Sequence, residues 1–135
     1  MKQLIFALCL CLGSWAQATP LSPQSQAEIE HLFDFLSGSG CEFQRNGSWY
    51  AAPKAAEHIR TKYDYLIKRD LINSAEEFIE LAASKSSMSG KDYQVKCVDQ
   101  STTTSATWFT QELARYRAEA QSTSTKNAQS FSNNQ

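Results

Sequence analysis

Apolar residues recur with helical spacing in four segments of the chain. In the first segment, Ile29, Leu32, Phe33 and Leu36 follow one another at intervals of three and four residues, which is typical of an amphipathic helix. Three later segments carry similar apolar stripes. The predicted helices span roughly 24–37, 53–68 and 74–83, and a fourth begins at Ser105.

Two further segments alternate between apolar and polar residues, as half-buried strands do. Asn46-Gly47 is a strong signal for a two-residue hairpin turn, and it places Phe43 opposite Tyr50. A second strand is predicted from Tyr93 to Cys97, followed by a turn and a β-prone return at residues 101–104.

The elements follow the order helix, strand, strand, helix, and this order occurs twice along the chain. Residue identities do not repeat between the halves, so the repeat concerns topology only. A single hairpin is marginally stable in water, whereas two hairpins joined in one sheet under helices can bury a core. We therefore expect an α+β fold with a small four-stranded antiparallel sheet, about four helices and one disulfide.

The two ends of the chain differ in composition from its middle. Lys2, the apolar run 4–12 and Ala16-Gln17-Ala18 form the pattern of a cleavable signal peptide over residues 1–18, with an uncleaved anchor as the alternative. Cleavage leaves no segment long enough to span a membrane. We expect a flexible leader over 19–27, one globular domain over 28–117 and a disordered polar tail over 118–135.

Charge and cysteine content narrow the classes of partner. The formal net charge is −1 and no basic stripe is present, which argues against nucleic acid; Arg115 and Arg117 are interpreted as ordinary solvated residues. Removing the signal peptide leaves Cys41 and Cys97, and a pair in an exported protein favours a disulfide over a catalytic thiol. The cysteine and histidine spacing fits no zinc motif, and we expect no metal and no cofactor.

A Cys41–Cys97 disulfide between antiparallel strands sets the register of the sheet. It places Phe43 opposite Val95 and Arg45 opposite Tyr93, with matching alternation on both strands. The Asn46-Gly47 turn then falls at the same end of the sheet as the polar segment 86–91. We therefore expect two polar loops to converge, and such loops on a rigid sheet commonly carry binding groups.

Candidate binding residues follow from this convergence. They are Arg45, Asn46, Ser86, Ser87, Ser89, His58 and Tyr93. An inward-leaning Arg45 needs a carboxylate or backbone carbonyls, so a purely structural tie to the serine loop is the alternative to ligand binding. His58 with a serine of 86–89 could serve a small hydrolase, although no recognised catalytic motif is present. We interpret His31 as a structural histidine.

Several of these residues also occur in a recognisable order. The segments in question are Phe43-x-Arg45-Asn46-Gly47-x-x-Tyr50, Ala55-Ala56-x-His58-Ile59-Arg60-x-Lys62, Ser74-Ala75-Glu76-x-Phe78-Ile79, Ala83-Ser84-x-Ser86-Ser87-x-Ser89-Gly90-x-x-Tyr93-x-Val95-Lys96, Trp108 and Tyr116-Arg117. Over roughly residues 28–117 the chain resembles the YfeK-like family of small exported bacterial proteins of unknown function. The resemblance implies a Gram-negative periplasmic location and implies no reaction, cofactor or ligand. The Cys41–Cys97 pair is not part of the family pattern.

Three functional hypotheses follow. The favoured one is a periplasmic, non-enzymatic binding or interaction module of the cell envelope, whose partner is an envelope protein or a small molecule. The second is a structural or stress-protective envelope protein. The third is the small hydrolase built on His58 and a serine of the 86–89 loop.

Overall fold

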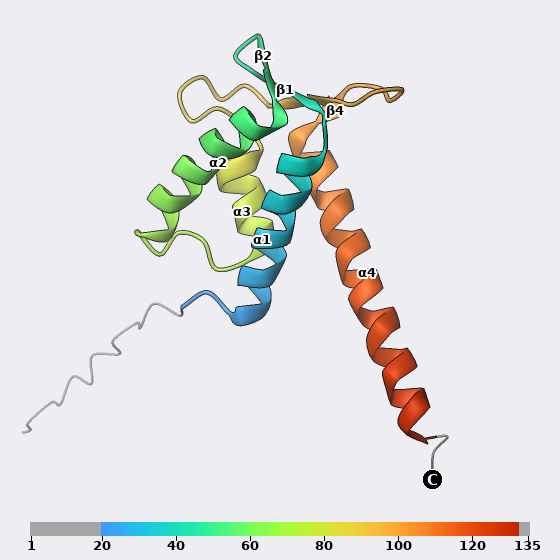
Figure 1. The fold of residues 1–135 in the computed structure, drawn as a ribbon. Helices are drawn as coiled ribbons and strands as arrows, with labels where there is room; N and C mark the ends of the chain where they lie inside the picture. Colours follow the sequence, from blue (N-terminus) through green and yellow to red (C-terminus); the bar gives the residue numbers. More distant parts are fainter. Residues whose placement is uncertain (1–19, 133–135) are drawn as a thin grey trace, which may run out of the picture.

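The computed structural model describes residues 20–132, so the predicted signal peptide lies outside the described residues. The elements follow one another as predicted, helix, strand, strand, helix, twice over (Figure 1). They are α1 (Pro23–Gly38), β1 (Glu42–Arg45), β2 (Ser48–Ala51), α2 (Ala52–Ile67), α3 (Ala75–Phe78), the π-helix η1 (Ile79–Ala83), β3 (Gln94–Lys96), β4 (Thr103–Thr104) and α4 (Ser105–Ser132). The α+β prediction is confirmed.

The four strands form one antiparallel sheet in the order β2-β1-β3-β4. Phe43 lies opposite Tyr50 in the hairpin and opposite Val95 across the sheet, as the two register arguments predict. Cys41 and Cys97 form the predicted disulfide.

The ladder between β1 and β3 ends one pair before Arg45 and Tyr93. The backbone N–H of Tyr93 donates to the Ser84 carbonyl (2.8 Å), and the Tyr93 carbonyl accepts from the N–H of Ser105 (2.9 Å). Both backbone groups of Tyr93 are therefore bonded to segments other than β1. Tyr93 is held beside the end of η1 and the start of α4.

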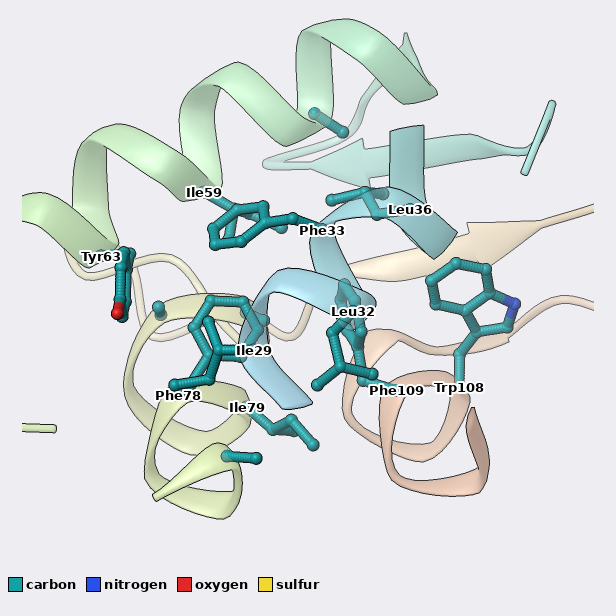
Figure 2. Packing of buried hydrophobic residues seen from close by; sticks show 14 of the residues in the cluster. Ile29, Leu32, Phe33, Leu36, Ile59, Tyr63, Phe78, Ile79, Trp108 and Phe109 are labelled. Atoms are coloured by element: carbon teal, nitrogen blue, oxygen red, sulfur yellow. The ribbon is translucent and has the colours of Figure 1, made fainter. Parts of the chain in front are cut away.

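The core lies between the helices, which all lie on one side of the strands (Figure 1). Figure 2 shows α1 at the centre of this packing. Phe33 of α1 contacts the ring of Phe78 with centroids 5.0 Å apart and the ring of Tyr63 at 5.8 Å. Because α1 contributes its whole apolar stripe, Ile29, Leu32, Phe33 and Leu36 are all buried.

The third helix begins with Ser74 as its cap but changes its winding after one turn. The Ser74 hydroxyl accepts from the N–H of Glu77, and the Glu77 carboxylate reaches back to the N–H of Asn73 rather than to that of Ser74. From Ile79 the chain continues as a π-helix, at whose end the Ser84 hydroxyl donates to the Ile79 carbonyl. A π-turn inside a helix re-aims the residues after it.

Hydroxyl caps set the starts of two other helices. α1 begins at Pro23, inside the predicted leader, because the Ser22 hydroxyl accepts from the N–H of Ser25 and caps it. At the start of α4 the cap is Thr104, whose hydroxyl accepts from the N–H of Thr107, and not Ser105.

The prediction of a disordered tail from residue 118 is wrong as far as Ser132, because α4 continues to that residue (Figure 1). The side chains of residues 118–129 are exposed, so packing does not hold this part. The packed first half of α4 supplies the helix nucleus, and each added residue then gains one backbone hydrogen bond. The hydroxyls of Ser122, Thr123, Ser124 and Thr125 also donate to carbonyls four residues back.

Candidate functional site

A cavity of about 260 Å³ opens between the β1–β2 hairpin and α2, and we call it the hairpin cleft. Its wall includes Phe43 and Arg45 of β1, Tyr50 of β2, His58 and Ile59 of α2, and Tyr93. Most of these side chains are apolar or aromatic. Such a concave, largely apolar surface with a few polar groups is the usual form of a small-molecule site.

The local chain path explains why the hairpin and α2 face one another. α2 starts at Ala52, directly after β2 ends at Ala51, so that no loop separates the two elements. Pro53 suits the first turn of the helix, where its missing N–H costs no hydrogen bond. Ile59 is buried in the core, and the adjacent His58 is half-buried at the cleft.

Three polar side chains from three parts of the chain form a hydrogen-bonded row along the cleft. Arg45 Nη1 lies 2.6 Å from Nδ1 of His58 and 3.0 Å from its Nε2. Nε2 of His58 also lies 3.2 Å from the Tyr93 hydroxyl. A guanidinium can only donate, so the ring nitrogen that bonds to Arg45 is an acceptor, and the shorter contact favours Nδ1 in that role. In the tautomer with the proton on Nε2, this nitrogen donates to the Tyr93 hydroxyl.

This arrangement keeps His58 uncharged. Burial, followed by the positive charges of Arg45 and then Lys62, lowers the pKa of His58 below its ordinary value. Burial likewise raises the pKa of Tyr93, although the charge of Arg45 partly opposes the shift. At neutral pH the row therefore carries one positive charge, that of Arg45.

Lys62 lies near the same row but has its own partner. Its ammonium donates to the Lys85 carbonyl (2.7 Å) and lies 5.6 Å from the centroid of the Tyr93 ring. Burial, followed by the charge of Lys85, lowers the pKa of Lys62. Lys62 thus ties α2 to the loop that precedes Tyr93.

The two polar loops converge as predicted. Asn46, at φ 50° in the hairpin turn, donates from Nδ2 to the Ser86 hydroxyl (3.4 Å) and accepts at Oδ1 from the Ser89 hydroxyl (2.6 Å). Ser86 is buried, whereas Ser87 is exposed. Within residues 20–132 no hydrogen bond joins Ser87 to Asn46 or Arg45, so the structure does not bring Ser87 into this contact.

The structure does not assemble the hydrolase pair. The ring nitrogens of His58 are bonded to Arg45 and Tyr93, and the hydroxyl of Ser86 accepts from Asn46 and from the N–H of Ser89. Across the described part of the chain, no hydrogen bond connects His58 to a serine of the 86–89 loop. The same residues contain no group of three metal-ligating side chains close enough to hold an ion.

Two buried carboxylates outside the cleft were not expected, and both pair with arginines interpreted as solvated. Glu28 of α1 accepts two hydrogen bonds from Arg117 of α4 (2.8 and 2.7 Å), and these lower the pKa of Glu28 although burial opposes the shift. Arg117 also bonds to Glu76 of α3 (2.6 Å). Arg117 therefore joins three helices.

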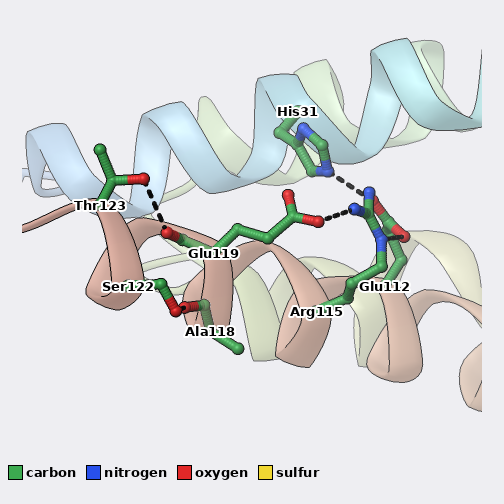
Figure 3. A network of polar contacts seen from close by, with 7 residues as sticks. All are labelled: His31, Glu112, Arg115, Ala118, Glu119, Ser122 and Thr123. Atoms are coloured by element: carbon green, nitrogen blue, oxygen red, sulfur yellow. Dashed lines mark hydrogen bonds and ion pairs between the residues drawn. The ribbon is translucent and has the colours of Figure 1, made fainter. Parts of the chain in front are cut away.

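Glu112 is the second buried carboxylate (Figure 3). It contacts His31 of α1 (2.6 Å) and accepts from Arg115 (2.8 Å). Burial raises the pKa of Glu112, but the hydrogen bonds of Arg115 and His31 outweigh it and leave the pKa lowered. The His31 ring stacks on Tyr116 at 4.0 Å, in keeping with a structural role. The burial of Glu28 and Glu112 could have been predicted from the sequence, because both carboxylates lie within the apolar stripes of their helices.

The fold and the cleft define a small α+β protein with a disulfide, one positively charged cleft and several helix-joining ion pairs. The chain belongs to the DUF5329 family, a family of unknown function, which matches residues 23–117. It is similar to the "Uncharacterized protein YfeK" of Salmonella typhimurium, with 34% identity over 90 residues, which are 66% of this chain and 71% of that protein. No solved structure matches.

The matched region contains the hairpin, α2 and the loops of the cleft. Among the described residues, no helix is both long enough and apolar enough to cross a membrane.

Proposed function

We propose that this protein is a small non-enzymatic binding module whose site is the hairpin cleft. One observation carries the proposal: the guanidinium of Arg45 lines the cleft, and within residues 20–132 it pairs with no carboxylate. Its hydrogen-bond partner is the neutral ring of His58, and its other close contact is the Tyr50 ring, 5.4 Å from the centroid. A half-buried charge without a counter-charge is costly unless a ligand provides one.

The cleft is also organised before any ligand arrives. His58 holds one end of the Arg45 guanidinium, and Asn46 ties the adjoining turn to Ser86 and Ser89. Side chains already ordered in the free protein lose little conformational entropy on binding. This arrangement favours recognition of a molecule at a fixed place.

The two alternatives receive less support. A purely structural role for Arg45 would have its donors occupied by backbone carbonyls and would leave no cavity, whereas Arg45 bonds to a side chain at the wall of a cleft. A hydrolase would need a nucleophile within reach of His58, and the hydrogen bonds of His58 lead to Arg45 and Tyr93 instead.

A ligand-observed NMR screen of a chemically diverse fragment library tests the proposal. Hits should compete with one another for one site and should lose binding in the Arg45→Met variant. Arg69→Met is the matched control, since Arg69 also lies over a tyrosine ring, that of Tyr65 at 3.6 Å, but is exposed and lies beyond the end of α2. Hits that bind equally to wild type and Arg45→Met would place the site elsewhere. A protein partner would instead appear as an Arg45-dependent product of cross-linking in cells.

We also propose that the module works in the periplasm. The proposal rests on the signal-peptide pattern of residues 1–18 and on the disulfide, which is stable in an oxidising compartment. Mass spectrometry of the protein recovered from a periplasmic extract should give a chain that starts at Thr19; recovery of the full-length chain from the cytoplasm would contradict it.

A further inference from the structure

The charges around the hairpin cleft leave a single unit of positive charge for a ligand. Lys54 and Glu57, both at the cleft, form an ion pair with each other (2.8 Å). His58 is neutral because burial and the neighbouring positive charges lower its pKa. Lys62 is not among the residues that line the cleft, and its ammonium donates to the Lys85 carbonyl. Arg45 is then the cation that remains without a counter-charge among the described lining residues. A monoanion matches the charge of these lining residues, and any further negative charge on the ligand would lie in the same cleft as Glu57.

The hydrogen-bonding geometry favours a carboxylate as that anion. The bonds of Arg45 to His58 use Nη1, and in residues 20–132 no hydrogen bond involves Nε or Nη2. Nε–H and Nη2–H form one side of the planar guanidinium fork, which is the side that binds a carboxylate through two parallel hydrogen bonds. In the tautomer of His58 with the proton on Nε2, the Tyr93 hydroxyl accepts from the ring, and its own proton is free to be donated to the ligand.

The remaining wall and the size of the cleft describe the rest of the ligand. Phe43, Tyr50, Ile59 and Tyr93 present mainly carbon surface. The volume of about 260 Å³ is slightly below the range of roughly 300–1,000 Å³ found for sites of drug-sized molecules. The body of the ligand should therefore be a single ring or a short aliphatic group, and aromatic bodies gain from edge contacts with the tyrosine and phenylalanine rings.

We propose that the hairpin cleft binds a small apolar or aromatic monocarboxylic acid. Its carboxylate lies on the free side of the Arg45 guanidinium, and its body packs against Phe43, Tyr50, Ile59 and Tyr93. This inference rests on the proposed function and adds the chemical class of the ligand. It concerns a binding step only, and no bond of the ligand is made or broken.

The test is a set of ¹H–¹⁵N NMR titrations of the oxidised chain without its first 18 residues. The probes are 3-phenylpropanoate, its neutral amide, 3-phenylpropylamine and inorganic phosphate, each at the same pH and ionic strength. The acid should shift the amide signals of β1, β2 and the start of α2, and it should bind at least about tenfold more tightly than the amide because a charge-assisted bidentate contact is lost in the amide. The amine should be the weakest.

Three variants separate the charge from the fold. Arg45→Met should bring the acid to the affinity of the amide, whereas Arg45→Lys should keep the preference for the acid at lower affinity, since lysine is a point charge without the fork. Arg69→Met should behave as wild type. The amide spectrum of each variant shows directly whether it is folded.

Each outcome of the titrations tests a different part of the proposal. Amide, amine or phosphate binding as tightly as the acid at these signals would overturn the carboxylate class and leave the cleft as the site. Preference for the acid that persists in Arg45→Met would overturn the role of Arg45. If no probe shifts these signals, the proposed ligand class is wrong. The proposed binding function is wrong as well only if the fragment screen also yields no Arg45-dependent hit.

Discussion

At the scale of single residues, Asn46 combines two roles in the hairpin turn. Its backbone adopts φ 50°, a left-handed conformation that asparagine tolerates better than most residues and that two-residue hairpin turns require. Its side chain bonds to Ser86 and Ser89, which lie 40 and 43 positions away in the sequence. The same residue therefore shapes the turn and holds it against the second polar loop, next to Arg45.

Two substitutions should separate these roles. Asn46→Gly keeps the turn conformation and loses the two side-chain contacts, which are worth about 1 kcal/mol together in a partly exposed site. Asn46→Ala loses the side-chain contacts and also the residue that tolerates the turn conformation. It should be less stable than Asn46→Gly by a further ~1 kcal/mol because of the cost of left-handed backbone. Urea unfolding at neutral pH measures both differences.

Asp70 provides the matched control, since it has φ 54° in an exposed position. Asp70→Ala should also be less stable than Asp70→Gly, while Asp70→Gly itself should lose little. If Asn46→Gly were as stable as wild type, the contacts with Ser86 and Ser89 would contribute nothing to holding the loops together.

At the scale of elements, the ion pair of Glu28 and Arg117 joins α1 to α4, as the contact of His31 with Glu112 also does. Glu28 is 3% exposed, so it needs a partner for its charge, and Arg117 provides two hydrogen bonds. Arg117 reaches α3 through Glu76 as well. The helices of the core are thus linked at a point where their apolar stripes end.

Arg117→Met should lower the free energy of unfolding at pH 7 by roughly 2–3 kcal/mol, because it leaves the buried Glu28 carboxylate without its charged donor. Lys96→Met is the control. Lys96 forms a solvent-exposed ion pair with Glu42, and the loss of this pair should cost at most about 1 kcal/mol. Urea unfolding of the two variants side by side measures the contrast, and equal losses would contradict a special role for Arg117.

The same pair predicts a pH dependence. The pKa of Glu28 is lowered in the folded protein, so its contribution is complete above the ordinary value of 4.5 and is lost as the pH falls through the lower, folded pKa. Wild type should therefore lose stability more steeply below pH 4.5 than Glu28→Gln does. Parallel curves for the two proteins would show that Glu28 is not stabilised by Arg117.

At the scale of the whole molecule, the disulfide connects the residue just before β1 with the residue just after β3, across 56 positions of sequence. Cross-linking the unfolded chain over this distance is worth at most roughly 4 kcal/mol on the chain-entropy model. For a domain of this size that is a large share of the usual stability.

Replacing both cysteines by alanine should therefore lower the free energy of unfolding by about 3–4 kcal/mol while the strand pairs of the sheet stay the same. Urea unfolding measures the loss, and amide contacts in NMR spectra report the register. Treatment of wild type with a reductant should reproduce the loss. An unchanged unfolding midpoint after complete reduction would contradict this prediction.

Features of short sequence range were predictable from the residues alone. Apart from the end of α4, the apolar stripes located the helices to within a few residues, because burial of one face repeats every three to four positions. Asn46-Gly47 identified the hairpin turn, and one cysteine pair was enough to orient β1 against β3, since a slip of one residue would have turned Phe43 and Val95 away from the core. The convergence of the two polar loops followed from that register.

Only the tertiary structure decided which partners the polar side chains take. Arg45 meets His58 rather than a carboxylate, and Glu28 meets Arg117 over 89 positions of sequence, because side-chain contacts depend on how separate helices pack and not on local periodicity. The extended α4 is a related case. Its polar composition resembles that of a disordered segment, yet a helix already nucleated by packing at Trp108 and Phe109 continues through it.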